Sequence, residues 1–319
     1  MDRETLPKVV VIGGGTGLPV ILKGLKKEKV NITAIVTVAD DGGSSGMIRK
    51  QMDVLPPGDI RNVMLALSNV DQRVVDLFQY RFEVEGELSG HVIGNLILTA
   101  LSQLNDSYVD AIQVLSKVLK IRGQVIPATD EPLVLHAEMQ DGSFINGESL
   151  IPLQGQPIKR VFIDPIDVKP LDTAVQAIAE ADLIVIGPGS LYTSILPNLL
   201  VKDIAAELIR TEAPVVYISN ILTQIGETDN FSDLDHIRVI HDHVGEPIIN
   251  HTLINTAEVP RELMFPEDVR QVAHDTEQIG KLGIHALTDD FLSTEEGLVR
   301  HDAKKVAAVL MKLLAQNNN

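Results

Sequence analysis

Short apolar runs that end in glycine-rich turns recur along the chain and predict the buried strands of a parallel sheet. Residues 9–12, 32–38, 183–186 and 214–218 are rich in β-branched side chains and show little polar alternation. Runs of this length and character are typical of strands that helices cover on both faces. Apolar residues at helical spacing follow the first run up to Leu25 and recur in residues 174–181. The pattern therefore predicts an α/β fold with a doubly wound, mostly parallel sheet.

The middle of the chain departs from this alternation. From Ile60 the apolar residues take helical spacing as far as Leu119, with a break near residues 69–71, which predicts a helical block. From Gln124 the helical period is lost, and Asp141-Gly142 between two apolar runs indicates a hairpin turn. We expect an antiparallel β insertion at about residues 124–163, within a single domain that spans residues 1–319.

Three of the predicted strands are followed by turns that suit phosphate. Backbone N–H groups and the helix dipole at such a turn favour an anion. The carboxyl ends of the strands form one crevice in a doubly wound sheet, so the turns should converge. The dinucleotide spacing is absent, because Leu18 stands where a third glycine belongs, and this disfavours a dehydrogenase. A tight turn without a ligand is the alternative for the first loop. The turns are Gly13-Gly14-Gly15-Thr16-Gly17, Asp40-Asp41-Gly42-Gly43-Ser44-Ser45-Gly46 and Gly187-Pro188-Gly189-Ser190.

Candidate catalytic groups are few. Asp40 and Asp41 are adjacent carboxylates, which repel each other unless solvent, a cation or hydrogen-bond donors intervene. They could hold Mg²⁺ or ribose hydroxyls, and a solvated turn is the alternative. His91 stands at a predicted helix start and could act as a general acid–base or cap the helix. A metal site is conceivable at four histidines: His236, His241, His243 and His251. No carboxylate motif accompanies them, so we expect no metal there.

Further polar residues are candidate ligand contacts. Asn220, Thr223 and Gln224 follow the strand at residues 214–218 and could read a sugar or base, or could cap a helix. Asp59 could cap the helix that follows it, and the neighbouring Arg61 is a credible partner for a phosphate.

Composition limits the function classes. The 319-residue chain has 44 Asp and Glu against 27 Lys and Arg, a formal net charge of −17, so it should repel nucleic acid. It has no cysteine, which excludes disulfides and thiolate chemistry. Because no apolar run reaches about 18 residues, we expect no membrane insertion. The first four residues, Met-Asp-Arg-Glu, lack the basic start of a signal peptide, and we expect a cytoplasmic protein.

Six motifs occur together in this chain and carry a family resemblance. The chain resembles the YvcK/CofD-like family across essentially its whole length, and is most similar to the bacterial YvcK branch. The resemblance implies a Rossmann-like fold with an open crevice and a homo-oligomer, a dimer or larger. The motifs are Gly-Gly-Gly-Thr-Gly, Asp-Asp-Gly-Gly-Ser-Ser-Gly, Pro-Pro-Gly-Asp-Ile-Arg-Asn, Gly-His-x-x-Gly-Asn, Gly-Pro-Gly-Ser-Leu-Tyr-Thr-Ser and Asn-x-x-Thr-Gln-x-Gly-Glu-Thr.

The resemblance implies two alternative functions. Proteins similar to YvcK are called gluconeogenesis factors; they bind UDP-sugars such as UDP-N-acetylglucosamine and are needed for cell shape and wall synthesis during gluconeogenic growth. The CofD branch is a 2-phospho-L-lactate transferase, which passes a phospholactyl group from a guanosine diphosphate carrier to a deazaflavin. Asp40 and Asp41 would hold magnesium in that case.

By the same resemblance, particular residues should lie near the ligand. Residues 13–17 and 187–190 should border the diphosphate of the ligand, and Arg300 should contact the ligand. One departure lies in residues 263–269, where relatives often carry a tyrosine and this chain has Phe265 instead. Five further residues are expected in the shared crevice: Asp40, Asp41, Asn62, Asn95 and Asn220.

Overall fold

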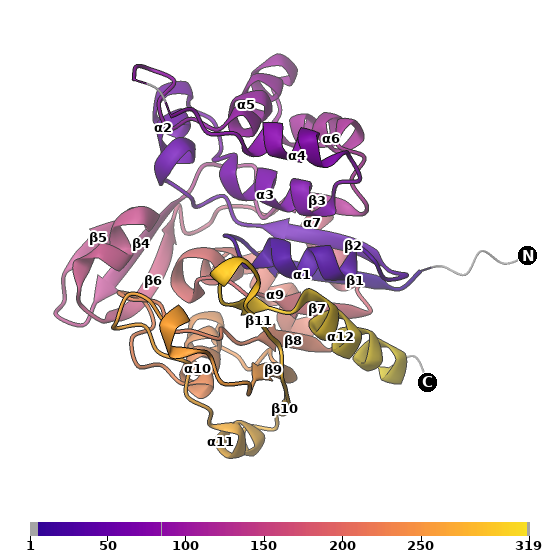
Figure 1. Cartoon of the computed structure of the whole chain (residues 1–319), viewed down its shortest axis with the longest axis vertical. Helices are drawn as coiled ribbons and strands as arrows, with labels where there is room; N and C mark the ends of the chain where they lie inside the picture. The colour runs from indigo at the N-terminus through magenta and orange to yellow at the C-terminus, as the bar shows by residue number, and fades with distance from the viewer. Residues whose placement is uncertain (1–5, 84, 318–319) are drawn as a thin grey trace, which may run out of the picture.

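A seven-stranded parallel sheet forms the centre of the molecule (Figure 1). The structure is a computed structural model that describes residues 6–83 and 85–317; the first four residues, on which the expectation about a signal peptide rests, lie outside this range. The strands lie in the order β10-β9-β8-β7-β1-β2-β3. Their bounds are β1 Lys8–Gly13, β2 Asn31–Val36, β3 Gln124–Pro127, β7 Leu183–Ile186, β8 Val215–Ile218, β9 His251–Asn255 and β10 His285–Asp289.

The winding of this sheet reverses between β1 and β7. From β1 the chain proceeds to β2 and β3 on one side, and from β7 it proceeds to β8, β9 and β10 on the other. Val10 of β1 pairs in parallel with Thr33 of β2 and with Ile184 of β7. In such a sheet the crevice opens at the carboxyl ends of the two strands where the order reverses. The predicted doubly wound, mostly parallel α/β fold is confirmed.

Helices cover the sheet and build a separate block at one end (Figure 1). Helix α1, Leu18–Leu25, packs against α3, Gly58–Leu67, and against the C-terminal helix α12, Ala303–Asn317. The predicted helical block from Ile60 contains α3, α4 Gln72–Gln79, α5 Ile93–Asn105 and α6 Tyr108–Val118, and α2 Gly43–Met52 precedes it. The other helices are α7 Asp172–Ala179, α8 Leu196–Leu199, α9 Lys202–Arg210, α10 Asp233–Val244 and α11 Thr276–Lys281.

The antiparallel insertion begins later than its sequence pattern indicates. Strand β3 was expected to open it, but Gln124 of β3 pairs in parallel with Thr33 of β2 at the edge of the main sheet. A strand-like pattern predicts the local conformation and says nothing about the partner, which explains the error. The insertion is a three-stranded sheet in the order β5-β4-β6, with β4 Val134–Met139, β5 Phe144–Asn146 and β6 Ile158–Asp164.

The apolar core follows the predicted strands. All four residues of β7 are buried, and so are Val9, Val10, Val11 and Ile12 of β1. Strands covered on both faces in this way hold the loops at their carboxyl ends in fixed positions. Among the described residues, no helix is long and apolar enough to cross a membrane. Short elements complete the chain: η1 Glu148–Gln154, η2 Leu191–Ile195, η3 Arg261–Leu263, β11 Leu292–Ser293, η4 Glu295–Gly297 and β12 Arg300–His301.

Candidate functional site

The glycine loops after β1 and β7 touch each other where the sheet order reverses. A Cβ atom on Gly17 would lie 2.7 Å from the carbonyl oxygen of Pro188, and one on Gly189 would lie 3.3 Å from that of Gly14. Only glycine permits so close an approach of the two backbones. The side chain of Asn198 adds a hydrogen bond, because its Nδ2 donates to the carbonyl oxygen of Gly13 over 3.2 Å. The predicted convergence of these two loops is therefore present.

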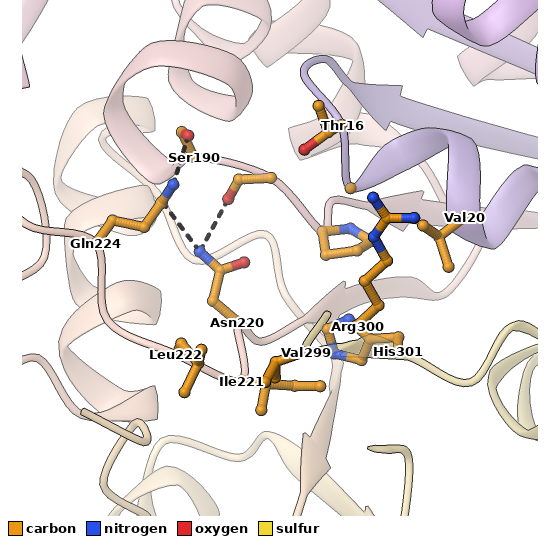
Figure 2. Close-up of a pocket in the computed structure, with 13 residues that line it drawn as sticks. Thr16, Val20, Ser190, Asn220, Ile221, Leu222, Gln224, Val299, Arg300 and His301 are labelled. Carbon is orange, nitrogen blue, oxygen red and sulfur yellow. Dashed lines mark hydrogen bonds between the residues drawn. The ribbon is translucent and has the colours of Figure 1, made fainter. Parts of the chain in front are cut away.

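A pocket of about 220 Å³ opens beside the two loops, and we call it the switch-point pocket (Figure 2). Arg300 is exposed, and it is the one permanently positive side chain among the described residues that line the pocket. None of the described residues that line the pocket is acidic, although the whole chain has a net charge of −17. The lining residues are Thr16, Gly17, Val20, Pro188, Gly189, Ser190, Asn220, Ile221, Leu222, Gln224, Val299, Arg300 and His301.

Hydrogen bonds fix the polar side of the switch-point pocket. Asn220 Nδ2 donates to the carbonyl oxygen of Gly189 over 3.0 Å, and Gln224 Nε2 donates to Ser190 Oγ over 2.7 Å (Figure 2). Asn220 Nδ2 also lies 3.4 Å from Gln224 Oε1. The segment after β8 is thereby tied to the loop after β7. The result is a preformed wall of amides and a hydroxyl, which are groups that recognise sugars and phosphates.

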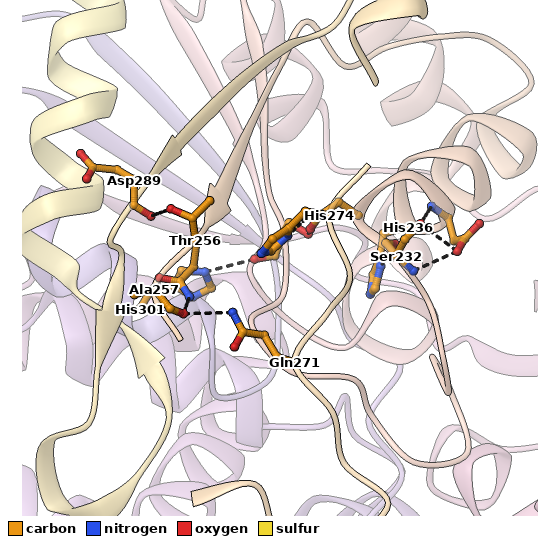
Figure 3. A network of polar contacts seen from close by, with 12 residues as sticks. Ser232, His236, Thr256, Ala257, Gln271, His274, Asp289 and His301 are labelled. Atoms are coloured by element: carbon orange, nitrogen blue, oxygen red, sulfur yellow. Dashed lines mark hydrogen bonds and ion pairs between the residues drawn. The ribbon is translucent and has the colours of Figure 1, made fainter. Parts of the chain in front are cut away.

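A network of polar contacts that includes His274 and His301 lies close to the switch-point pocket (Figure 3). His301 donates from Nε2 to the carbonyl oxygen of Ser219 over 3.1 Å, and burial lowers its pKa to about 4, so the ring is neutral. The Ser219 hydroxyl donates to Asp233, whose other oxygen lies 2.7 Å from His274 Nδ1. The network holds the end of β8 in place beside Asn220.

Asp59 binds the first glycine loop. Its Oδ2 accepts a hydrogen bond from the backbone N–H of Gly15 over 2.8 Å, and burial raises its pKa to about 6. The expectation that Asp59 caps α3 is wrong, because Pro57 occupies the cap position and no side chain caps that helix. Since one amide of the glycine loop already has an acceptor, fewer amides are free for a phosphate.

Asp40 and Asp41 lie outside the switch-point pocket. Asp40 Oδ1 accepts from the backbone N–H of Gly42 over 3.0 Å, and Asp41 Oδ1 accepts from that of Ser149 over 2.8 Å. Asp41 therefore fastens α2 to the insertion at η1. Among the described residues no three histidine, cysteine or carboxylate side chains form a preformed metal site, so magnesium at this position stays a prediction.

The remaining predicted residues of the helical block form one buried network. Arg61 donates from Nη1 to Asn95 Oδ1 over 2.6 Å and from Nη2 to Asn62 Oδ1 over 2.7 Å. Asn95 Nδ2 in turn donates to Ser44 Oγ over 3.1 Å, and the backbone N–H of Val92 donates to the same oxygen over 3.2 Å. These contacts join the starts of α2, α3 and α5. A second hydroxyl, that of Ser45, accepts from the backbone N–H of Gly58 over 3.1 Å.

Two predicted contacts lie away from the pocket. Thr223 Oγ1 accepts from the backbone N–H of Arg270 over 3.0 Å, so it braces the segment after β9 instead of facing a ligand. Capping by Asn220 or Thr223 is also wrong, because the next helix, α10, is capped by Ser232.

His91 is buried, and its Nδ1 has no partner among the described residues. Phe265 is exposed and does not line the pocket.

The histidine-rich stretch takes no part in a metal site in the described residues. Three of its members, His236, His241 and His243, lie on helix α10, where residues two apart, such as His241 and His243, point in different directions. His243 Nε2 accepts from the backbone N–H of Val161 in the insertion over 3.0 Å, and its Nδ1 lies 2.7 Å from the carbonyl oxygen of Val239. These histidines hold backbone segments together.

Two further carboxylates lie near the glycine loops: Glu227, one of the polar residues that follow β8 in the sequence, and Glu148, which sequence reasoning missed. Glu227 accepts from Thr193 Oγ1 over 3.1 Å, and burial raises its pKa to about 7. The pKa of Glu148 rises to about 8, because the side chain is buried and because Asp40, Asp41 and Asp59 repel its charge. Glu148 has no local motif to mark it, since the insertion brings it to Asp41 from far along the chain.

Comparison with known proteins gives a consistent result. Residues 9–292 match the family model described as 2-phospho-L-lactate transferase CofD. The chain is 73% identical over 319 residues to the gluconeogenesis factor of Listeria innocua, covering 100% of this chain and 99% of that protein. It is 48% identical over 313 residues to the gluconeogenesis factor of Bacillus subtilis, covering 97% and 99%.

A solved structure agrees with these relatives. Protein BH3568 from Bacillus halodurans is 46% identical and superposes with a TM-score of 0.94, covering 96% of this chain and 99% of that one. The two structures therefore share the fold over nearly their whole length. On the family model and these full-length relatives together, the chain belongs to the CofD/YvcK family.

Proposed function

We propose that this protein is a gluconeogenesis factor that binds a UDP-sugar, such as UDP-N-acetylglucosamine, in the switch-point pocket. The main support is that two glycine loops meet at a pocket that is lined, among the described residues, by Arg300 and by no carboxylate. In a chain of net charge −17, a lining without carboxylates favours a diphosphate over a neutral or cationic ligand. Asn220, Gln224 and Ser190 supply the hydrogen-bonding groups that a sugar needs.

Calorimetry with UDP-N-acetylglucosamine tests this proposal. We expect binding by the wild type and at least a tenfold weaker affinity in Arg300→Gln, because the pocket loses its one permanent positive charge. Arg73→Gln is the matched control, since Arg73 is an exposed residue of α4 that lies outside the pocket. Absence of heat from the wild type at millimolar ligand would reject the proposal.

The proposed cellular role is the maintenance of cell shape and envelope synthesis during gluconeogenic growth. It rests on the names of the relatives, which are gluconeogenesis factors at 73% and 48% identity. The test is complementation in a Bacillus subtilis strain that lacks its own 48% identical relative. The wild-type gene should restore normal cells on a gluconeogenic carbon source, and the Arg300→Gln gene should not. Equal rescue by both genes would separate the cellular role from the pocket.

A CofD-type phospholactyl transferase is the second candidate function. Glu227 and Glu148 have pKa values of about 7 and 8, which suit proton transfer near neutral pH. Bound magnesium would offset the repulsion among these carboxylates, and Asp40 and Asp41 remain its predicted ligands. Transfer from the guanosine diphosphate carrier to a deazaflavin, reduced at least a hundredfold in Glu148→Gln, would support this function. An inactive wild type with authentic substrates would remove it.

A further inference from the structure

A second pocket, of about 370 Å³, lies next to the switch-point pocket and is lined by four cationic side chains. Lys23 comes from α1, Lys27 from the turn just after α1, Arg300 from β12 and Lys304 from the first turn of α12. We call it the basic pocket. Helices α1 and α12 run side by side in this region (Figure 1), and Gly24 allows this, because a Cβ there would overlap the carbonyl oxygen of Ala303.

The four cations are unpaired. None of them forms an ion pair with a residue that the structure describes. Lys23 lies in the last turn of α1 and Lys27 lies just past the end of that helix, so two like charges are close together. Lys304 stands in the first turn of a 15-residue helix, where the helix dipole disfavours a cation. Burial, followed by repulsion from Lys23 and Lys27, lowers the pKa of the neighbouring Lys26. An anion in the pocket would relieve each of these unfavourable placements.

Three carboxylates also line the basic pocket, and they offset three of its four positive charges. Asp302 is occupied by its own helix, because its Oδ1 accepts from the backbone N–H groups of Lys304 over 2.8 Å and Lys305 over 3.1 Å. The other two, Glu295 and Glu296, are exposed on η4. Four cations against three carboxylates leave the lining with a formal excess of one positive charge, on a chain whose net charge is −17.

We infer that the basic pocket is a second binding site, for a small anion of the diphosphate class, separate from the UDP-sugar site. Its cations come from α1 and the turn after it, from β12 and from α12, around a concave space, which is the arrangement that holds a multiply charged anion. The two pockets share Val20, Arg300 and His301 as a common wall. The inference goes beyond the proposed function, since it requires only an anion and not a nucleotide.

Calorimetry with inorganic pyrophosphate at low ionic strength tests the inference. The test variant is Lys23→Gln/Lys27→Gln, which removes two charges from the basic pocket and leaves the switch-point pocket intact. The matched control is Lys50→Gln/Lys312→Gln, because both are exposed lysines that lie outside the two pockets. Both variants should have a Tm without anion within about 2 °C of that of the wild type, which establishes that each is folded.

We expect pyrophosphate to bind the wild type and the control, and to bind the test variant at least fivefold more weakly. The inference is overturned if the wild type shows no binding at roughly 20 mM pyrophosphate, a concentration at which even a weak anion site would be filled. It is also overturned if all three proteins agree within about twofold, because pyrophosphate then binds elsewhere.

UDP-N-acetylglucosamine titrated into the same samples separates this result from the proposed function. An affinity for the sugar nucleotide that is unchanged in the test variant, together with weakened pyrophosphate binding, supports two separate sites. An equal loss for both ligands shows that Lys23 and Lys27 act on the switch-point pocket at long range, and this overturns the inference. If the wild type ignores the sugar nucleotide but binds pyrophosphate through the two lysines, the proposed function fails and the basic pocket stands.

Discussion

The carboxylate of Asp59 and the backbone N–H of Gly15 lie 2.8 Å apart and form a partly buried hydrogen bond between α3 and the first glycine loop. The bond joins the helical block to the sheet at the point where the sheet order reverses. It also places a carboxylate, with a pKa of about 6, directly behind a loop that we propose borders a diphosphate. Above that pKa the side chain is charged: it still holds the loop, but it also places a negative charge beside the proposed diphosphate.

Substitutions of Asp59 should separate these two roles. Asp59→Asn keeps an oxygen that can accept from Gly15 and removes the charge, so stability above pH 6 should be equal to or greater than that of the wild type. Asp59→Ala leaves the Gly15 N–H without its acceptor and should lower the free energy of unfolding by about 1–3 kcal/mol. Urea denaturation at pH 7.5 measures both. Equal destabilisation by the two variants would show that the charge itself is required.

Stability should fall as the pH rises from 6.5 to 8.5. The folded-state pKa values of Glu227 and Glu148, about 7 and about 8, are raised above the ordinary 4.5. The folded protein therefore holds more protons than the unfolded chain in this window, and stability decreases with increasing pH. Burial lowers the pKa of His301 and of other histidines. These groups lower the stability of the fold only as the pH falls through their pKa in the unfolded chain, near 6.5. Urea denaturation at the two pH values provides the measurement.

Glu148→Gln should flatten this pH dependence. The variant removes a charge that Asp40, Asp41 and Asp59 repel, and its gain at pH 8.5 should be on the order of 1 kcal/mol. Glu246→Gln, on an exposed residue after α10, is the control and should leave the slope unchanged. A slope that is the same in Glu148→Gln and the wild type would mean that other groups carry the titration.

The parts of the site that follow directly from strand ends could be read from the sequence. The loops at residues 13–17 and 187–190 meet because parallel strands leave their carboxyl ends on one edge, and the apolar runs show which segments are those strands. Asn220 and Gln224 were found for the same reason. Arg300 lies on the short strand β12 and carries no such signal, so only the family resemblance indicated it.

The parts that depend on distant partners could not be read in this way. β3 has a strand-like pattern, but its pairing with β2 is a property of the assembled sheet. The pKa of Glu148 is raised only because η1 packs against Asp41 in the folded chain. Asp59 accepts a hydrogen bond from Gly15 instead of capping its own helix. In each case a tertiary contact overrides the role that the local sequence indicates.

Alanine at Gly24 should be strongly destabilising. A Cβ at this position would overlap the carbonyl oxygen of Ala303 and push α1 away from α12, and backbone atoms cannot move aside as a flexible side chain does. We expect a loss of about 2 kcal/mol or more in the free energy of unfolding. Gly280→Ala is the control, because that glycine lies in α11 with open space around its Cβ position and should gain about 0.5–1 kcal/mol. Thermal and urea unfolding compare the two.

Asn220→Asp should weaken an anionic ligand more than it weakens the fold. The amide Nδ2 donates to the carbonyl oxygen of Gly189, and a carboxylate at that position would face this oxygen with no proton to share. It would also put the first acidic side chain among the described residues of the switch-point pocket, where it would repel a diphosphate. We expect at least a tenfold rise in the Kd for UDP-N-acetylglucosamine at pH 8, partly reversed at pH 5 as the new carboxyl takes up a proton. Calorimetry at the two pH values measures the reversal, and a Kd that does not change with pH in the variant would mean that the ligand avoids Asn220.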